Sequence, residues 1–223
     1  MQGFDVEQFR LEPGAHPGSP DGCLMEWVAL MSGLPKTDRP RCINQLVTSV
    51  AIHLNDTLDD ASRQRLKGFI PRLLRARRGP ADDRIAVRLA IWAATTMAGS
   101  APPELRALHD RVVTAASGRL AGVVTEGDCR GLASTAAEAG ARAKNVALYV
   151  AADAAHAACA DDPYGAAANA VAGALHWVLS HGDPLAWLGG LLDARAAAWA
   201  AEVGAPAGVT EDPLLKDAVC CPA

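Results

Sequence analysis

The chain has 223 residues, half of them hydrophobic, so it is long enough to enclose a substantial core. Its formal net charge of −4 provides no general attraction to nucleic acid or to an anionic membrane surface, which disfavours both as partners. The longest apolar runs are interrupted by His, Asp or Gly before they reach the roughly 20 residues that a membrane-spanning helix needs.

The amino-terminal segment MQGFDVEQFRLEP lacks the basic stretch followed by an apolar stretch that marks a secretory signal. We therefore expect a cytoplasmic protein. In that compartment the six cysteines are expected to be thiols rather than a disulfide framework, and none of them forms a CxxC pair. Adjacent Cys220 and Cys221 could bind a soft metal or exchange disulfides, although an ordinary tail accounts for them more simply.

Residues 1–20 begin with apolar side chains in loose alternation and continue into PGAHPGSP, whose Pro and Gly residues exclude a helix. We expect an extended arm here that lies on the helices. Residues 21–204 are expected to form a single helical domain, and residues 205–223 a carboxy-terminal tail with a short helix from 213 to 219.

Helical periodicity and capping signals predict the elements that follow the arm. The first helix follows Asp21 and stops at Gly33, where glycine suits a left-handed position after the helix. Thr37 or Asp38 is the predicted N-cap of a second helix that ends near 55–56. A third helix opens at 59–60 and runs through 66, and Pro71 breaks or restarts it.

The second half of the chain is rich in alanine and poor in β-branched runs, which favours helices over a sheet. The expected helices span about 82–98, 104–116, an alanine-dominated stretch at 128–160, then 164–179 and 184–203. The fold class is therefore all-α, an irregular bundle of about seven or eight helices with an extended amino-terminal arm.

The first candidate site lies at the opening pair of helices. Cys23 and Glu26 are three residues apart and share a helix face, and an antiparallel partner could bring Cys42 and Asp38 nearby. Two thiolates with carboxylates would suit a divalent metal, or a thiol nucleophile with a carboxylate beside it. We therefore treat Cys23, Glu26, Asp38 and Cys42 as candidate catalytic residues.

A structural interpretation of the same residues competes with this one. In it Asp38 caps the second helix, Asn55 and Asp56 cap the turn into the third, and the two cysteines pack as small apolar side chains. This interpretation predicts that the polar groups hold backbone ends rather than perform chemistry.

The same stretch resembles a known family. The runs CLMEWVALMSG, DRPRC, LND and RQRLKGFIPRLL are similar to the opening of a family of uncharacterised proteins from actinobacteria and their phages. The matching residues are Cys23, Met25, Glu26, Gly33, Asp38, Pro40, Cys42, Asn55, Asp56, Ile70, Pro71, Arg72 and Leu73. The resemblance implies a bacterial source but no activity, and it departs at Thr37, where the family pattern has Ser, and in the carboxy-terminal CysCysProAla.

A second candidate site lies in the alanine-rich stretch, where Asp153, His156 and Cys159 are spaced three apart and could present metal ligands along one side of a helix. No second Glu-x-x-His run exists, which disfavours a di-iron carboxylate bundle. A polar stripe that faces solvent is the alternative.

The segment from 63 to 78 carries seven basic residues and no acidic one. Arg72 and Arg75 from this segment, with Arg84 and Arg88 from the next helix, are the predicted ligand-binding residues for an anionic small molecule or an acidic protein partner. The alternative is a solvated helix face, neutralised by the acidic pairs at 59–60 and 82–83.

Two functions remain open. The sequence contains no dinucleotide-binding, P-loop, HExxH or GxSxG motif, so no standard catalytic framework applies. The first hypothesis is a non-catalytic helical module that binds a protein partner or an anionic ligand. The alternative is a small thiol- or metal-dependent enzyme with its site between Cys23, Glu26 and Cys42, where Arg84 or Arg88 would hold an anionic substrate.

Overall fold

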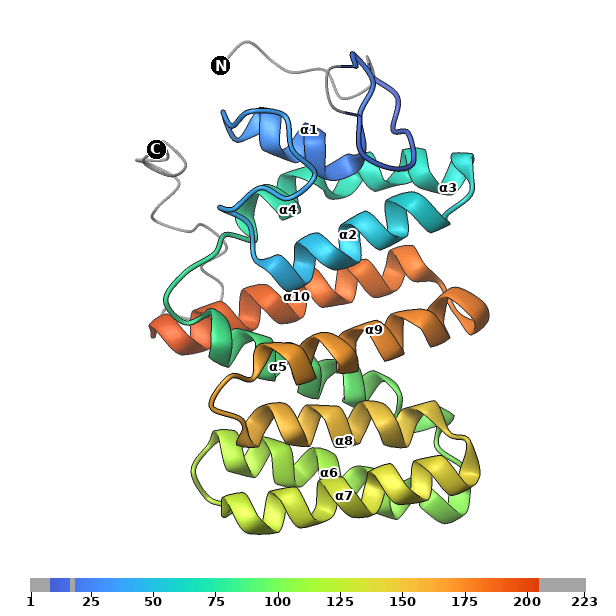
Figure 1. Ribbon diagram of the computed structural model, residues 1–223, viewed down its shortest axis with the longest axis vertical. Helices are drawn as coiled ribbons and strands as arrows, with labels where there is room; N and C mark the ends of the chain where they lie inside the picture. Colours follow the sequence, from blue (N-terminus) through green and yellow to red (C-terminus); the bar gives the residue numbers. More distant parts are fainter. Residues whose placement is uncertain (1–8, 17–18, 205–223) are drawn as a thin grey trace. The chain divides into compact units, whose positions relative to one another are not determined.

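The computed structural model describes residues 9–16 and 19–204, and these residues form ten α-helices and two short 3₁₀ helices (Figure 1). They contain no β-strand, only isolated bridges between Leu11 and Gly22 and between Ile43 and Arg77. The predicted all-α class is therefore confirmed. No helix in the described ranges has both the length and the apolar character needed to span a membrane. The predicted helix at 213–219 and the Cys220–Cys221 pair lie outside the described residues.

The described residues divide into two compact units, one ending at Gly79 and the other beginning at Pro80. Gly and Pro both interrupt regular backbone hydrogen bonding, so this pair suits a connection between units. The sequence analysis expected a single helical domain over 21–204 and placed no boundary at this pair.

The first unit is a small helical cluster. It contains α1 (Leu24–Met31), α2 (Gln45–Thr57), α3 (Asp60–Arg65), η2 (Leu66–Phe69) and α4 (Ile70–Arg75). Helix α1 packs on α2 and α4. The buried apolar side chains of this unit include Leu24, Met25, Val28, Leu46, Leu54, Leu66, Ile70 and Leu73. As predicted, α1 stops before Gly33, which has a φ of 76°.

The predicted start of the second helix is wrong. Helix α2 begins at Gln45, and its N-cap is Asn44, whose Oδ1 accepts hydrogen bonds from the backbone N–H groups of Leu46 (3.1 Å) and Val47 (3.3 Å). Asp38 caps no helix. The helix starts later because a long-range contact holds the preceding segment: the Asn44 N–H donates to the Ala76 carbonyl (2.7 Å). A segment paired in this way cannot also make helical hydrogen bonds.

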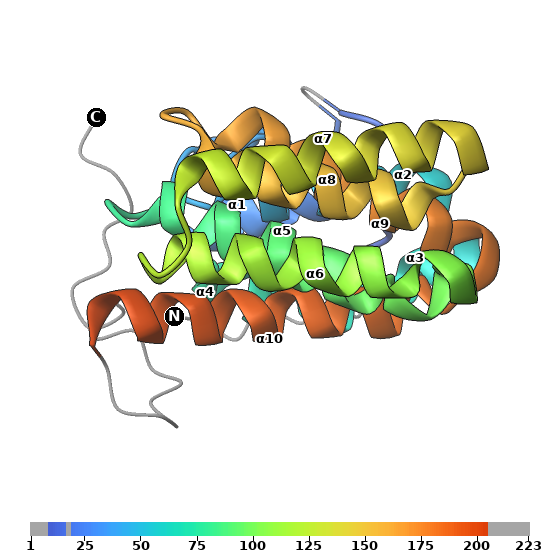
Figure 2. The same cartoon turned by 90° about the horizontal axis from the view of Figure 1, so that it is seen from below.

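The second unit contains the remaining helices, and α8 lies in contact with α5, α6, α7 and α9. These helices are α5 (Asp82–Thr96), η3 (Ala98–Ser100), α6 (Pro103–Leu120), α7 (Glu126–Ala143), α8 (Val146–Cys159), α9 (Tyr164–His181) and α10 (Pro184–Val203). Alanines fill much of this core, so the helix axes can approach closely. Figure 2 shows α7 running alongside α8.

The predicted stretch at 128–160 is two helices that form an antiparallel hairpin. Lys144 ends α7 in the left-handed conformation, with a φ of 50°, and Asn145 caps α8 by accepting from the Leu148 N–H at 3.2 Å. A Cβ at Gly140 would lie 3.2 Å from the Leu148 Cβ, so the absent side chain lets the two helices approach. Alanine fits either face of a helix, and it therefore hid this break in the sequence pattern.

A second close approach joins α10 to α5. A Cβ at Gly190 would lie 2.9 Å from Cζ2 of Trp92, whose ring also packs at 5.1 Å from that of Trp187. The indole of Trp92 thus rests directly on the backbone of α10, and no other residue type leaves room for it.

We predict that Gly190→Ala lowers the free energy of unfolding by about 1–2 kcal/mol, because the overlap with a stiff ring outweighs the gain in helix propensity. Gly131→Ala in α7 is the matched control: nothing lies within 4 Å of the added Cβ, so stability should rise by about 0.5–1 kcal/mol. Urea unfolding followed by circular dichroism measures both. Equal effects of the two substitutions would contradict the packing argument.

Candidate functional site

The start of α1 is built as a reciprocal cap. Cys23 is the N-cap residue, and its thiol accepts from the backbone N–H of Glu26, while Glu26 Oε2 accepts from the Cys23 N–H at 2.8 Å. Glu26 Oε1 accepts from the His16 N–H, also at 2.8 Å. Glu26 is only 2% exposed, so its carboxylate is committed to the helix end and to the arm.

The electrostatics of this cap affect its two side chains in opposite directions. Burial alone raises the pKa of Glu26, but hydrogen bonds from the N–H groups of Cys23 and His16, together with the nearby Lys36 ammonium, bring the pKa below its ordinary value. For Cys23, burial dominates and the Glu26 charge adds to it, so its pKa rises to about 11. At neutral pH the pair is therefore a thiol beside a carboxylate, and a thiol is a poor nucleophile.

Asn55 joins three segments of the first unit. Its Oδ1 accepts from the Leu24 N–H at the start of α1 (3.1 Å), and its Nδ2 donates to the Glu12 carbonyl in the arm (2.8 Å). Asp56 holds the arm next to it by accepting from the Gly14 N–H at 2.7 Å. Both side chains do bind backbone groups, but those of α1 and the arm, and not those of the turn into α3 as predicted.

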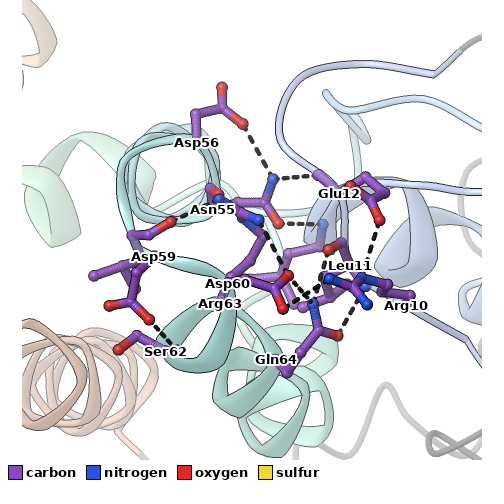
Figure 3. Close-up of polar contacts among 12 residues, drawn as sticks. Arg10, Leu11, Glu12, Asn55, Asp56, Asp59, Asp60, Ser62, Arg63 and Gln64 are labelled. Carbon is purple, nitrogen blue, oxygen red and sulfur yellow. Dashed lines mark hydrogen bonds and ion pairs between the residues drawn. The ribbon is translucent and has the colours of Figure 1, made fainter.

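Figure 3 shows that Gln64, which lies near Asn55, also faces the arm. The Gln64 amide makes two hydrogen bonds with the Leu11 backbone, one to its carbonyl (2.9 Å) and one from its N–H (3.0 Å). The Arg63 Nε donates to the Asn55 carbonyl and its Nη2 to the Leu58 carbonyl, both at 2.6 Å. Gln64 therefore fixes the arm and Arg63 fixes the end of α2, two roles that the sequence analysis did not predict.

Asp59 has the predicted capping role and accepts from the Ser62 N–H at 3.0 Å to start α3. Cys42 is buried before α2, where its carbonyl accepts from the Arg78 N–H at 2.8 Å, and Asp38 is half-buried outside any helix. Within residues 9–16 and 19–204, no three His, Cys, Asp or Glu side chains are placed to hold a metal ion together. The candidate cluster of Cys23, Glu26, Asp38 and Cys42 is therefore not assembled as a metal centre.

The same finding applies to Asp153, His156 and Cys159 on α8. Asp153 is half-buried, and burial raises its pKa although His156 partly opposes this. His156 is exposed, while Cys159 is buried against α7, with its thiol 3.9 Å from the Glu126 carbonyl. The three side chains therefore point into different surroundings.

Arg84 and Arg88 meet an acidic partner that the sequence did not reveal. Glu202 on α10 accepts from the Arg84 Nε at 2.6 Å and from the Arg88 Nε at 2.7 Å, and its side chain is only 9% exposed. Burial raises the pKa of Glu202, but the two guanidinium groups bring it below its ordinary value. Arg72 and Arg75 lie on α4 of the first unit, where the former is half-buried and the latter exposed.

Arg88 also lines a groove of about 360 Å³ in the second unit. The other lining residues come from α5, α6 and α10 and are almost all apolar: Ile91, Trp92, Ser117, Leu120, Ala194, Ala197 and Ala198. The Ser117 hydroxyl already donates to the Val113 carbonyl at 3.0 Å. Among the described residues, Arg88 is therefore the one charged group on the groove wall, and Glu202 holds it in place.

Comparisons with known proteins add no assignment: no protein-family model matches the chain, and no match was found among curated proteins or solved structures.

We predict that Asn55→Ala lowers the free energy of unfolding by about 2–4 kcal/mol, because it leaves a buried N–H at Leu24 and a carbonyl at Glu12 without partners. The matched control is Asp183→Ala, which removes the surface N-cap of α10 and should cost about 1 kcal/mol. Denaturant unfolding compares the two. A loss at Asn55 no larger than at Asp183 would show that the amide does not organise the arm.

The pKa of Glu26 also predicts a pH dependence. Its folded pKa lies below the ordinary value of 4.5, so its contribution to stability is complete above about pH 4.5 and is lost as pH falls toward the folded pKa. Glu26→Gln should cost about 2–3 kcal/mol at pH 7 and progressively less below pH 4.5. Unfolding free energies across this range test it, with exposed Glu138→Gln as a control whose effect should stay small throughout.

Proposed function

We propose that the protein is a non-catalytic helical binding module whose ligand is a small anion with an apolar portion, held in the groove at Arg88. The observation that carries this proposal is the chemistry of the groove wall. An apolar surface with one guanidinium group suits a molecule that has a hydrophobic body and a carboxylate or similar head. Ligand sites of this volume are common in proteins of this size.

Glu202 supports the proposal because it prepares Arg88 for binding. The carboxylate binds the Arg88 Nε, which leaves the two Nη nitrogens without a hydrogen bond to the described residues. Two such N–H donors on a planar group match the two oxygens of a carboxylate. Because Glu202 also binds Arg84, one carboxylate orients two guanidinium groups, and the cluster keeps a net positive charge.

The thiol enzyme has less support. A nucleophilic cysteine needs a lowered pKa and a base within reach, whereas Cys23 has a raised pKa and Glu26 accepts from two backbone N–H groups. Reaction at this cap would also require the arm to leave Glu26, whose Oε1 accepts from the His16 N–H. We therefore rank the binding module first.

The test is binding of octanoate by isothermal titration calorimetry, with octylammonium as a ligand of the same apolar body and opposite charge. Octanoate should bind and octylammonium should bind at least about tenfold more weakly. Arg88→Met should weaken octanoate binding about 10- to 100-fold, the range expected for a hydrogen bond to a charged group. Equal binding of the two ligands, or none of octanoate, would refute the proposal.

Arg84→Met provides the matched control. It removes the other guanidinium from Glu202 but leaves the groove lining unchanged, so octanoate affinity should change less than about threefold. Ala197→Leu fills the groove without altering charge and should weaken binding at least about tenfold. A larger loss from Arg84→Met than from Arg88→Met would place the anion outside the groove.

A further inference from the structure

Two free cysteines meet inside the hairpin of the second unit. Cys129 lies in the first turns of α7, and Cys159 is the last residue of α8. Both are free thiols and both are buried, with exposed fractions of 0% and 6%. Within the described part of the chain no third residue joins them as a metal ligand, and neither lines the groove at Arg88.

Their hydrogen bonds are reciprocal across the helix contact. The Cys129 Sγ donates to the Ala155 carbonyl at 3.6 Å, one turn before Cys159, and the Cys159 Sγ donates to the Glu126 carbonyl at 3.9 Å, one turn before Cys129. Each thiol thus lies against the helix turn that carries the other one. Burial is the main cause of the raised pKa of Cys129, and the neighbouring Cys159 thiol raises it further.

We propose that Cys129 and Cys159 are a redox modification site that closes to an intramolecular disulfide and locks α7 to α8. The oxidant is a low-molecular-weight disulfide, RSSR. The Cys159 thiolate attacks one sulfur of RSSR and releases RS⁻, and the Cys129 thiolate then attacks the Cys159 sulfur and releases the second RS⁻. Two protein thiols are oxidised to one disulfide, and RSSR is reduced to two RSH.

The order of attack follows from position. Cys159 ends its helix, where local opening is least costly, while Cys129 is fully buried and burial raises its pKa to about 12. Opening of this helix end must break the bond from the Arg130 Nη2 to the Cys159 carbonyl, at 3.1 Å.

The experiment uses the full chain with Cys220→Ser and Cys221→Ser, so that the tail thiols cannot react. Incubation with oxidised glutathione under native conditions should lower the mass by about 2 Da, and peptide mapping should link Cys129 to Cys159. Cys23 and Cys42 should remain thiols and serve as internal controls. The melting temperature should rise by about 5–10 °C and return on reduction, because the bond closes a long loop.

Cys129→Ser, or Cys129→Ala if the serine variant does not fold, isolates the first step. In this variant Cys159 should accumulate as a mixed disulfide with glutathione, because the second thiol is missing. Persistence of four thiols after native oxidation would overturn the proposal. It would equally be overturned by a stable glutathione adduct on Cys159 when Cys129 is present, or by a disulfide that forms only in urea.

Discussion

Asn55 is completely buried, and a buried amide must find partners for both its oxygen and its nitrogen. It finds them at the first N–H of α1 and at a carbonyl of the arm, so one side chain from α2 fixes where another helix starts and where the extended segment lies. Glu26 completes this arrangement from α1, because it accepts from an arm N–H as well as from its own helix end. The arm has one backbone partner at Gly22, and side chains such as these supply further ones.

The second unit depends on a different constraint, which is the close approach of helices that lack side-chain bulk. Gly140 and the buried alanines allow α7 and α8 to pack nearly backbone to backbone. Gly190 on α10 likewise allows the Trp92 ring of α5 to pack directly against the α10 backbone. Close approach has two chemical consequences. It brings the thiols of Cys129 and Cys159 to the same helix contact, and it leaves a shallow apolar groove beside Arg88.

Features encoded by neighbouring residues could be predicted from the sequence. Helix α10 begins at Pro184 after the Asp183 cap and ends at Val203, as expected, because Asp, Pro and Gly carry those signals locally. The start of α2 could not be predicted, since its segment pairs with residues more than 30 positions away, near Ala76. A distant backbone partner overrode the local cap signal at Asp38.

Partners of the candidate site residues were hidden for the same reason. Arg84 and Arg88 are recognisable in the sequence as basic residues, but their partner Glu202 lies 118 and 114 positions away. No local sequence pattern connects Glu202 to either arginine. For the thiols a signal did exist. Residues at equal distances from the turn of an antiparallel hairpin face one another, and Cys129 and Cys159 lie about equally far from Lys144. To use that signal one must know where the turn lies, and the alanine-rich sequence does not indicate its position.

Glu26 in the first unit and Glu202 in the second have different kinds of hydrogen-bond partner. The partners of Glu26 suit a structural role, and those of Glu202 suit the proposed ligand binding. The charge of Glu26 is balanced mainly by backbone N–H groups, so both of its oxygens are occupied and no donor remains for a ligand. Glu202 is balanced by two guanidinium groups, each of which carries more N–H donors than one carboxylate can accept. Surplus donors held in a fixed direction beside an apolar wall are what an anionic ligand requires. This difference in partners is the reason why we place the proposed anion binding at Arg88 and not at Glu26.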